Sequence, residues 1–165
     1  MKTVAALVCL CAMAATAAAQ IQVDLTFKRV QYVAYEPVIA TVNITNLAGR
    51  DIELRDDNGQ RWFGFEVTAG EGRFLAPLTA LSEVPLKVEA GKTVARKVNL
   101  TPDFPVHDLG AYHVRANVFF ADLNKFFYSQ TKVFQVEDAR PIWQRTVGIP
   151  EGIHTAGTVR TYSLL

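Results

Sequence analysis

Hydrophobic residues recur at every second position along much of the chain. From Ile21 to Lys28 four apolar side chains alternate with four polar ones, and the segment from Val38 to Thr45 repeats the alternation. Successive side chains of a β-strand point to opposite faces, so this period of two predicts strands with one buried face. The chain is therefore expected to fold from strands, with very little helix.

Shorter apolar segments between turn residues extend the pattern. Further strands are expected at Ile52 to Arg55, Arg61 to Val67, Leu86 to Glu89, Thr93 to Leu100, His107 to Phe120 and Lys125 to Val136. Asp56-Asp57-Asn58-Gly59 predicts a hairpin, because Asn-Gly readily adopts positive φ values. About seven or eight short strands predict an all-β fold, an antiparallel sandwich. Only Pro77 to Glu83 could hold a helical turn, and Thr68 to Pro85 is the longest irregular stretch.

Residues 1–19 have the features of a signal peptide. Lys2 precedes an apolar run from Val4 to Met13, and alanines at positions 17 to 19 fit cleavage before Gln20. The run is shorter than the roughly 20 residues of a membrane-spanning helix, so we expect no membrane insertion after cleavage. Both cysteines, Cys9 and Cys11, lie in this leader, so the remainder needs a core instead of disulfides. The sequence predicts a secreted or periplasmic protein of a bacterial cell envelope.

Charge argues against two classes of partner. Without Lys2, the 17 basic residues of the chain become 16, which balance its 16 acidic residues. Nucleic-acid binders carry a basic patch or stripe, and peripheral membrane proteins carry a basic amphipathic helix. The sequence has neither pattern, so no nucleic-acid partner is expected.

The C-terminal part differs in pattern from the rest. We expect one domain over residues 20–137, followed by a linker, because residues 142 to 155 contain Pro150 and glycines without a sustained period. Thr158 to Leu165 alternates like a strand. Within residues 138–165, this segment is expected to be an edge strand of the sandwich or the start of a further domain.

The segment His107 to Phe120 contains the pattern D-x-G-x-Y at Asp108, Gly110 and Tyr112. This pattern resembles a structural corner of immunoglobulin-like sandwiches, in which a tyrosine hydroxyl binds the upstream backbone. In this resemblance Val114 stands where bridged members have their second cysteine, and Trp62 is placed like the core tryptophan. The resemblance covers residues 21 to 136 and implies an immunoglobulin-like β-sandwich.

A second stretch, YVAYEPVIATVNITNLAGRDIEL at residues 32–54, resembles bacterial exported macroglobulin-type domains and the intracellular proteinase inhibitor family. The chain has no cysteine-glutamine thioester, so protease trapping by that chemistry is not expected. Simple inhibition through an exposed loop remains open.

Catalytic and metal-binding patterns are weak. The sequence has no G-x-S-x-G or H-E-x-x-H motif, and a triad would need His107 or His113 with one of three serines. The histidines and serines considered are His107, His113, His154, Ser82, Ser129 and Ser163. We expect His113 to face solvent with Arg115 and Asn117, and no enzyme activity. Asp56, Asp57 and Asn58 offer oxygen ligands for calcium, but a turn explains them, so no metal or cofactor is expected.

Aromatic residues gather around the last strong hairpin. Phe119, Phe126, Phe127 and Tyr128 flank its tip at residues 121–124. Exposed rings at a loop end are typical of recognition sites for sugars, peptides or a neighbouring domain. Alternatively, the tail covers these rings through Ile142 and Trp143, which is the interpretation we favour from the sequence.

These observations predict an exported, non-catalytic immunoglobulin-like module that serves as a binding or spacer domain of a bacterial cell-envelope or secreted protein. Its partner would be a protein or glycan ligand or a neighbouring domain. Two alternatives stay open: a protease-inhibitor-like domain, with the loop at Thr68 to Pro85, and an accessory domain of a larger secreted hydrolase.

Overall fold

The computed structural model describes residues 20–79, 83–140, 143–149 and 158–164, so the predicted leader, residues 1–19, lies outside the described residues. The described chain is all-β apart from one short 3-10 turn, η2, at Ala121–Leu123. The strands are β1 Ile21–Phe27, β2 Gln31–Val33, β3 Ile39–Asn46, β4 Ile52–Leu54, β5 Phe63–Ala69, β6 Arg73–Leu75, β7 Leu86–Val88, β8 Thr93–Asn99, β9 Gly110–Phe120, β10 Lys125–Tyr128, β11 Lys132–Glu137, β12 Trp143–Ile149 and β13 Thr158–Leu164. The prediction of an all-β chain is confirmed.

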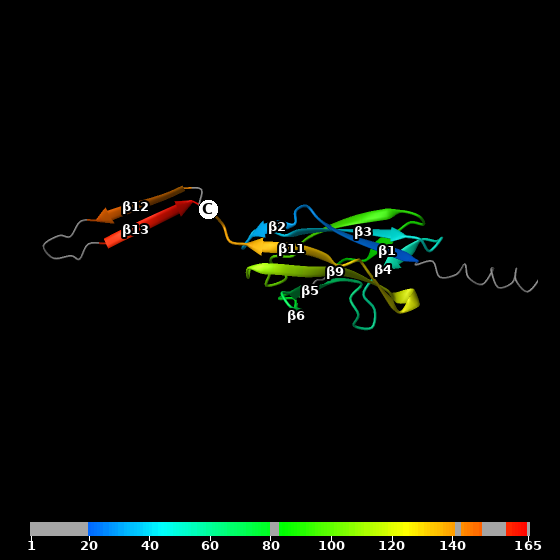
Figure 1. Ribbon diagram of the computed structural model, residues 1–165. Helices are drawn as coiled ribbons and strands as arrows, with labels where there is room; N and C mark the ends of the chain where they lie inside the picture. The colour runs from blue at the N-terminus through cyan, green and yellow to red at the C-terminus, as the bar shows by residue number, and fades with distance from the viewer. Residues whose placement is uncertain (1–19, 80–82, 141–142, 150–157, 165) are drawn as a thin grey trace, which may run out of the picture.

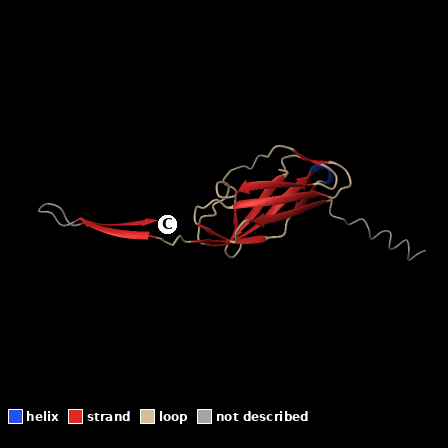
Figure 2. Ribbon diagram, turned by 90° about the horizontal axis from the view of Figure 1, so that it is seen from above, coloured by secondary structure: helices blue, strands red, loops and turns tan. Residues whose placement is uncertain are grey.

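Two sheets form the body, the name used here for the described part of residues 20–137 (Figures 1 and 2). One sheet has three strands in the order β1-β3-β8. The other has six strands: β2-β11-β9-β5-β6 in order, with β10 also paired to β9. All pairs in both sheets are antiparallel except β2 with β11, which is parallel. A short separate pair, β4 with β7, contacts β9.

One hydrophobic core joins both sheets. The inward residues of β1 and β3 are nearly all buried, which is the physical meaning of their period of two. Opposite them, Val114 and Phe134 of the larger sheet are inaccessible to solvent. Trp62 is also fully buried just before β5, and its indole N–H donates to the Glu83 carbonyl at 3.3 Å. The core therefore holds Trp62 together with the alternating apolar residues of β5.

The Asn-Gly turn forms, but it does not join two paired strands. Asn58 and Gly59 have φ values of 47° and 80°, and Asp57 and Gln60 exchange two backbone hydrogen bonds. However, β4 pairs with β7 and β5 pairs with β9, so the predicted hairpin between the flanking strands is wrong. The turn depends on local backbone preference, whereas the pairing depends on which side chains the core can bury.

Two short strands were not predicted. Strands β2 and β6 have three residues each, too few to display a period of two. Strand β6 lies within Thr68 to Pro85, so this stretch is not the continuous irregular loop that the sequence suggested. Of the predicted helical turn at Pro77 to Glu83, residues 77–79 and 83 are not helical, and residues 80–82 lie outside the described residues. No helix in the described ranges is long and apolar enough to cross a bilayer.

The C-terminal segment corrects a further prediction. Residues 143–149, expected as part of a linker, form strand β12, which pairs in antiparallel register with β13. Strand β13 is therefore not an edge strand of the body, and this hairpin lies outside the body (Figure 1). The predicted linker residues 150–157, which include His154, lie outside the described residues. The period of two was weak here because Arg145 interrupts the face that carries Trp143 and Val147.

Candidate binding groove

The bend before β9 places the three residues of the D-x-G-x-Y pattern. The Tyr112 hydroxyl donates to the Asp108 carbonyl at 2.8 Å, and only 1% of Tyr112 is exposed. Gly110 has a φ of +134°, a conformation that side chains disfavour. The Tyr112 ring stacks on Phe134 with centroids 5.2 Å apart. Burial raises the pKa of the Tyr112 hydroxyl, and the nearby Asp108 carboxylate adds to this effect.

The four predicted aromatic residues divide between two faces of the β9–β10 hairpin. Phe127 is nearly buried in the core, opposite Val118. On the other face, Phe119 and Phe126 contact each other with centroids 4.9 Å apart, and Phe126 lies 6.1 Å from Tyr128. Phe119 is buried and Tyr128 is 44% exposed. The outer face of this hairpin is therefore a continuous aromatic cluster that reaches solvent at Tyr128.

The tail does not cover this cluster in the way the sequence suggested. Trp143 is 51% exposed and lies on β12, which pairs with β13. The turn η2 at the tip of the aromatic hairpin lies at the far end of the body from β12 and β13 (Figures 1 and 2). Ile142, the other expected contact, lies outside the described residues.

A charged pair continues the aromatic cluster across the sheet. The Arg115 guanidinium lies 4.2 Å from the centroid of the Tyr128 ring, within the range of a cation–π contact. Its Nη2 and Nε donate to Oε2 of Glu66 at 2.6 and 3.1 Å. Tyr128, Arg115 and Glu66 belong to β10, β9 and β5. The ring, the guanidinium and the carboxylate thus form a row across three strands, in which each group contacts the group on the neighbouring strand.

A groove of about 580 Å³ lies beside this row. Its floor includes Gly64 of β5 and Asn117 of β9, which are opposite each other in the ladder. A Cβ atom at Gly64 would lie 3.0 Å from the Asn117 amide oxygen, so the glycine lets the Asn117 side chain lie over the strand and form part of the floor. Phe126 and Tyr128 border the groove on one side.

The opposite wall of the groove is the segment from Pro77 to Thr79. The Leu78 N–H donates to the Asp103 carbonyl at 2.7 Å, and the Thr79 hydroxyl donates to the Asp103 carboxylate at 2.6 Å. Phe104, from the same loop as Asp103, is buried and also borders the groove. The wall is therefore anchored to the loop between β8 and β9.

The candidate catalytic residues lie apart from the groove. The His107 ring stacks on the exposed Tyr35 ring, with centroids 5.5 Å apart, and its Nε2 is 3.7 Å from an Asp108 oxygen. His113 is half-buried on β9. Among hydrogen bonds between described residues, none joins either histidine to a serine.

The serines have backbone or hairpin partners. The buried Ser129 hydroxyl accepts from the Ala116 N–H at 3.0 Å and donates to the Gln130 carbonyl at 2.9 Å. Ser163 binds Gln144 across the β12–β13 pair. Ser82, the third serine considered, lies outside the described residues.

The carboxylates of the turn at residues 56–59, considered above as calcium ligands, accept hydrogen bonds from nearby residues. An Asp56 carboxylate oxygen accepts from the Trp62 N–H at 2.9 Å, and Asp57 accepts from the Asn58 amide at 3.0 Å. Across the described ranges, no three His, Cys, Asp or Glu side chains gather closely enough to hold a metal ion. These carboxylates stabilise the turn that leads into β5.

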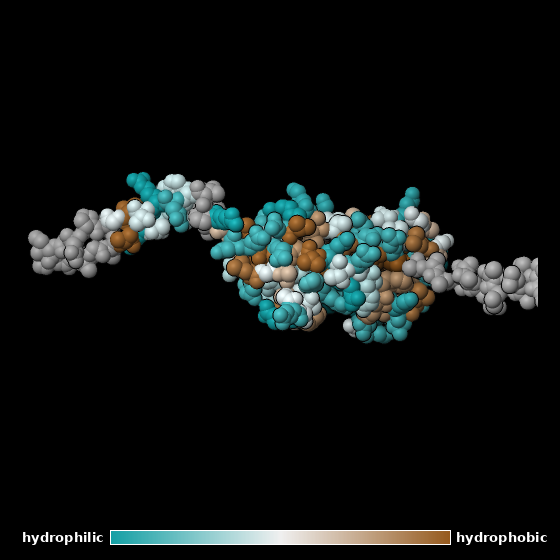
Figure 3. All heavy atoms as spheres, viewed as in Figure 1, coloured by the Kyte–Doolittle hydropathy of each residue, from teal (hydrophilic) through white to brown (hydrophobic). Residues whose placement is uncertain are grey.

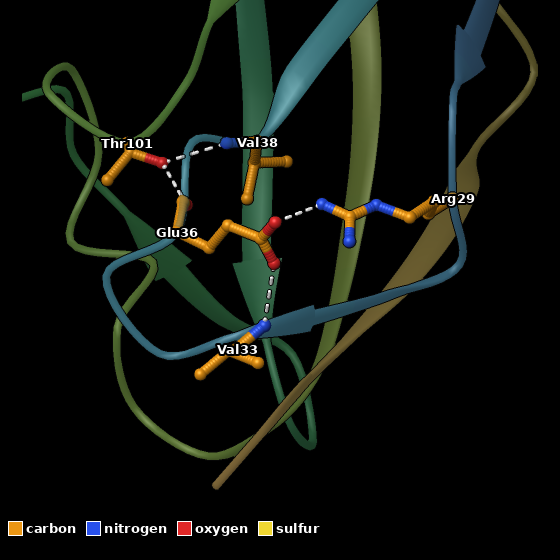
Figure 4. A network of polar contacts seen from close by, with 5 residues as sticks. All are labelled: Arg29, Val33, Glu36, Val38 and Thr101. Atoms are coloured by element: carbon orange, nitrogen blue, oxygen red, sulfur yellow. Dashed lines mark hydrogen bonds and ion pairs between the residues drawn. The ribbon is translucent and has the colours of Figure 1, made fainter. Parts of the chain in front are cut away.

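A polar network fixes the loop between β2 and β3 (Figure 4). The Glu36 carboxylate forms an ion pair with Arg29 and accepts from the Val33 N–H at 3.1 Å. The Arg29 hydrogen bond lowers the pKa of the Glu36 carboxyl, and the Val33 N–H adds to this effect. The Thr101 hydroxyl donates to the Glu36 carbonyl at 2.9 Å and accepts from the Val38 N–H at 3.0 Å. The network ties this loop to the one that follows β8.

Sequence reasoning missed Gly64, Glu66 and Pro77 as site residues. It placed Arg115 and Asn117 on an outer face, and both are half-buried there. The signal for the groove was absent because it requires the register that sets Glu66 opposite Arg115 and Gly64 opposite Asn117. That register joins segments about fifty residues apart in the chain.

Comparisons with known proteins find similarity in structure but not in sequence. No family model matches the sequence, and no curated protein matches it. The sporulation control protein Spo0M from Bacillus subtilis is similar in structure, with 12% sequence identity and a TM-score of 0.48. The similarity covers 74% of this chain and 51% of that chain, so this chain spans about half the length of that structure.

Proposed function

We propose that this chain is an exported, non-catalytic module with an immunoglobulin-like sandwich that binds a protein or glycan ligand. The groove carries this proposal. It combines a floor formed by Gly64 and the half-buried amide of Asn117 with the partly exposed ring of Tyr128. Ligand sites commonly join apolar and aromatic walls to a few polar groups that fix orientation.

Two features support the finer parts of this proposal. The Tyr112 hydroxyl bond to Asp108 is the contact expected at the corner of an immunoglobulin-like sandwich. The leader-like residues 1–19 and the absence of cysteine from residues 20–165 support export to a secreted or periplasmic location. Expression in a bacterial host followed by N-terminal sequencing tests the export step, with Gln20 as the expected first residue.

Ligand binding is tested by nuclear magnetic resonance titration of the purified protein with a panel of oligosaccharides and peptides. The amide signals of Gly64, Asn117 and Tyr128 are expected to shift on binding. The variant Gly64→Val would displace the Asn117 amide, which lies 3.0 Å from the position of the new Cβ atom, into the groove and abolish the shifts. Thr68→Val is the matched control because Thr68 is half-buried on the same strand but does not line the groove. A panel that shifts no groove signal would count against the proposed function.

The hairpin of β12 and β13 favours a second candidate function, attachment to a neighbouring domain. Trp143 and Val147 share one face of β12, and the ladder places Tyr162 of β13 on the same face. All three are exposed, and apolar groups are visible on the hairpin in Figure 3. Thr146 and Thr161 bind each other on the opposite face.

Arg145 and Arg160 lie on the same face of the hairpin as Trp143. An isolated two-stranded pair is marginally stable in water, so a partner that covers this aromatic and basic face would stabilise the hairpin. Limited proteolysis tests the arrangement. Cleavage after residue 140 is expected to release the hairpin and leave the melting temperature of the body unchanged. A melting temperature that falls with cleavage would mean that the hairpin belongs to the body.

A further inference from the structure

Strand β5 has one fully paired edge and one half-paired edge. Strand β9 pairs with β5 from Phe63 to Ala69. On the other side, β6 pairs only with Val67 to Ala69. Among the described residues, no strand covers the edge from Phe63 to Glu66, and these four residues border the groove.

The backbone groups on this open edge can be assigned from the ladder. The Phe119 N–H donates to the Trp62 carbonyl at 2.8 Å, and at the other end of β5 the Gly70 N–H donates to the Ala111 carbonyl at 2.9 Å, so these residues occupy hydrogen-bonded positions of the ladder. In antiparallel sheets such pairs alternate with pairs whose backbone groups point away. The N–H and C=O groups of Phe63 and Phe65 thus point away from β9, toward the groove. No hydrogen bond from another described residue reaches them.

Proline explains why β6 does not cover this edge. Val67 is opposite Leu75, so two further residues in the same register would set Pro77 opposite Phe65. Proline has no N–H and cannot donate to a ladder, so it ends a strand or lies at its edge. The chain instead leaves β5 at Ala76, and the segment from Pro77 to Thr79 stands apart as the wall of the groove.

We propose that the ligand of the groove is an extended peptide of a partner protein, which adds as a strand to β5 from Phe63 to Glu66. This inference rests on the proposed binding function and names its ligand class. The peptide runs antiparallel to β5 along the line that β6 leaves at Pro77. Four residues span about 13 Å at the strand repeat, so a segment of about four or five residues fills the edge.

Side-chain alternation gives this peptide a pattern. The residue opposite Gly64 faces the outer side, where the Asn117 amide lies over the glycine and the rings of Phe126 and Tyr128 border the groove. A large apolar or aromatic side chain fits this position. The charged residues of the lining are Arg61 and Glu66, one of each sign, near the two ends of the open edge. The described lining between these two residues is uncharged, which favours a peptide with uncharged central residues.

The geometry favours a peptide over a glycan. Strand addition obtains affinity from main-chain hydrogen bonds and specificity from alternate side chains. The groove presents backbone donors and acceptors at the spacing of a strand, which matches a peptide backbone. The Glu66 carboxylate and Arg115 guanidinium already bind each other, so they are less available to sugar hydroxyls.

The test selects random seven-residue peptides on phage against the purified protein and then uses the enriched peptide as a synthetic probe. Amide hydrogen exchange is measured with and without this peptide. Binding is expected to slow exchange at Phe63 and Phe65 by about ten-fold or more, because their N–H groups gain partners. Gly64 and Glu66 serve as internal controls, since their backbone groups already face β9.

Two N-methylated peptides separate strand addition from side-chain recognition. Methylation of a peptide N–H that faces β5 should weaken binding roughly ten-fold, because it removes one hydrogen bond and places a methyl group against the strand. Methylation at the next residue, whose N–H points away from β5, should leave affinity nearly unchanged. This matched pair has the same composition and differs only in which face of the backbone is blocked.

Three other outcomes would overturn the inference that a peptide adds as a strand to β5. Equal binding of the two methylated peptides, or protection away from Phe63 and Phe65, would exclude strand addition but leave the groove as a binding site. Oligosaccharides that shift the groove signals when no peptide binds would replace the ligand class and keep the proposed function. Failure of both peptides and oligosaccharides to shift those signals would remove the proposed function as well.

Discussion

The hydroxyl of Tyr112 offers a measurement of the bend before β9. In the variant Tyr112→Phe only this oxygen is lost, and the ring can keep its stacking contact with Phe134. The hydrogen bond to the Asp108 carbonyl disappears, and a bond of this kind contributes about 1 kcal/mol net to stability. Asp108 is exposed, so water can reach its carbonyl and keep the cost near that value. By contrast, Tyr112→Ala also opens a cavity in the core, at a cost of about 3 to 5 kcal/mol.

Urea unfolding measures both variants. With a slope of about 2 kcal/mol per molar urea, Tyr112→Phe should lower the midpoint by about 0.5 M and leave the slope unchanged. An unchanged midpoint would mean that the hydroxyl bond contributes nothing. A loss as large as that of the alanine variant would mean that the phenylalanine ring does not keep its place. Either result would refute the reasoning.

The pH dependence of the same pair provides a second check. The pKa of Tyr112 is raised in the folded protein, mainly by burial, so the folded state favours the neutral phenol. An unfolded tyrosine ionises near pH 10, which stabilises the unfolded state first. Stability of the wild type should therefore fall as pH rises above about 10, and Tyr112→Phe should lack this contribution. The advantage of the wild type over the variant is expected to shrink in that range.

Three further substitutions test other parts of the body. Asn46→Ala should cost about 3 kcal/mol in urea unfolding, because the fully buried Asn46 amide satisfies the carbonyls of Arg50 and Val88 and the N–H of Ala48; a loss below 1 kcal/mol would contradict this role. Glu36→Gln should remove stability that the wild type has above about pH 4.3, the unfolded pKa of glutamate, and loses as pH falls through the lowered folded pKa. The two proteins should converge in acid, and a constant difference down to acid pH would exclude the ion pair as the cause. Trp143→Ala should change the melting temperature of the body by less than the error of calorimetry, since half of its side chain is exposed on the separate hairpin; a clear decrease would place the hairpin against the body.

Local chemistry made several features predictable. The alternation in Ile21 to Lys28 defines β1 because one face must be buried, whatever the partner strand is. The turn at Asn58 and Gly59 was predictable because it requires positive φ values, which asparagine and glycine tolerate better than other residues. The spacing of Asp108, Gly110 and Tyr112 marked a bend, and the hydroxyl bond closes within four residues. In each case the interaction lies within a few residues of sequence.

The groove was not predictable in the same way. Pro77 would lie opposite Phe65 only if the register set at Val67 and Leu75 continued, and the sequence suggested an irregular stretch here. The role of Gly64 depends on Asn117, which lies fifty-three residues away, 117 minus 64. Strand β12 was expected as part of a linker because its apolar side chains do not alternate without interruption, and only its pairing with β13 shows that it is a strand.

The amino-acid sequence settled that this chain is built of strands, and where most of the longer ones lie, because side-chain period and backbone preference act over a few residues. The tertiary structure decided which strands pair. It set β5 beside β9 instead of β4, and it left the edge from Phe63 to Glu66 open beside Pro77. Pairing is decided by burial of both sheet faces in one core, a property of distant segments that no short stretch contains.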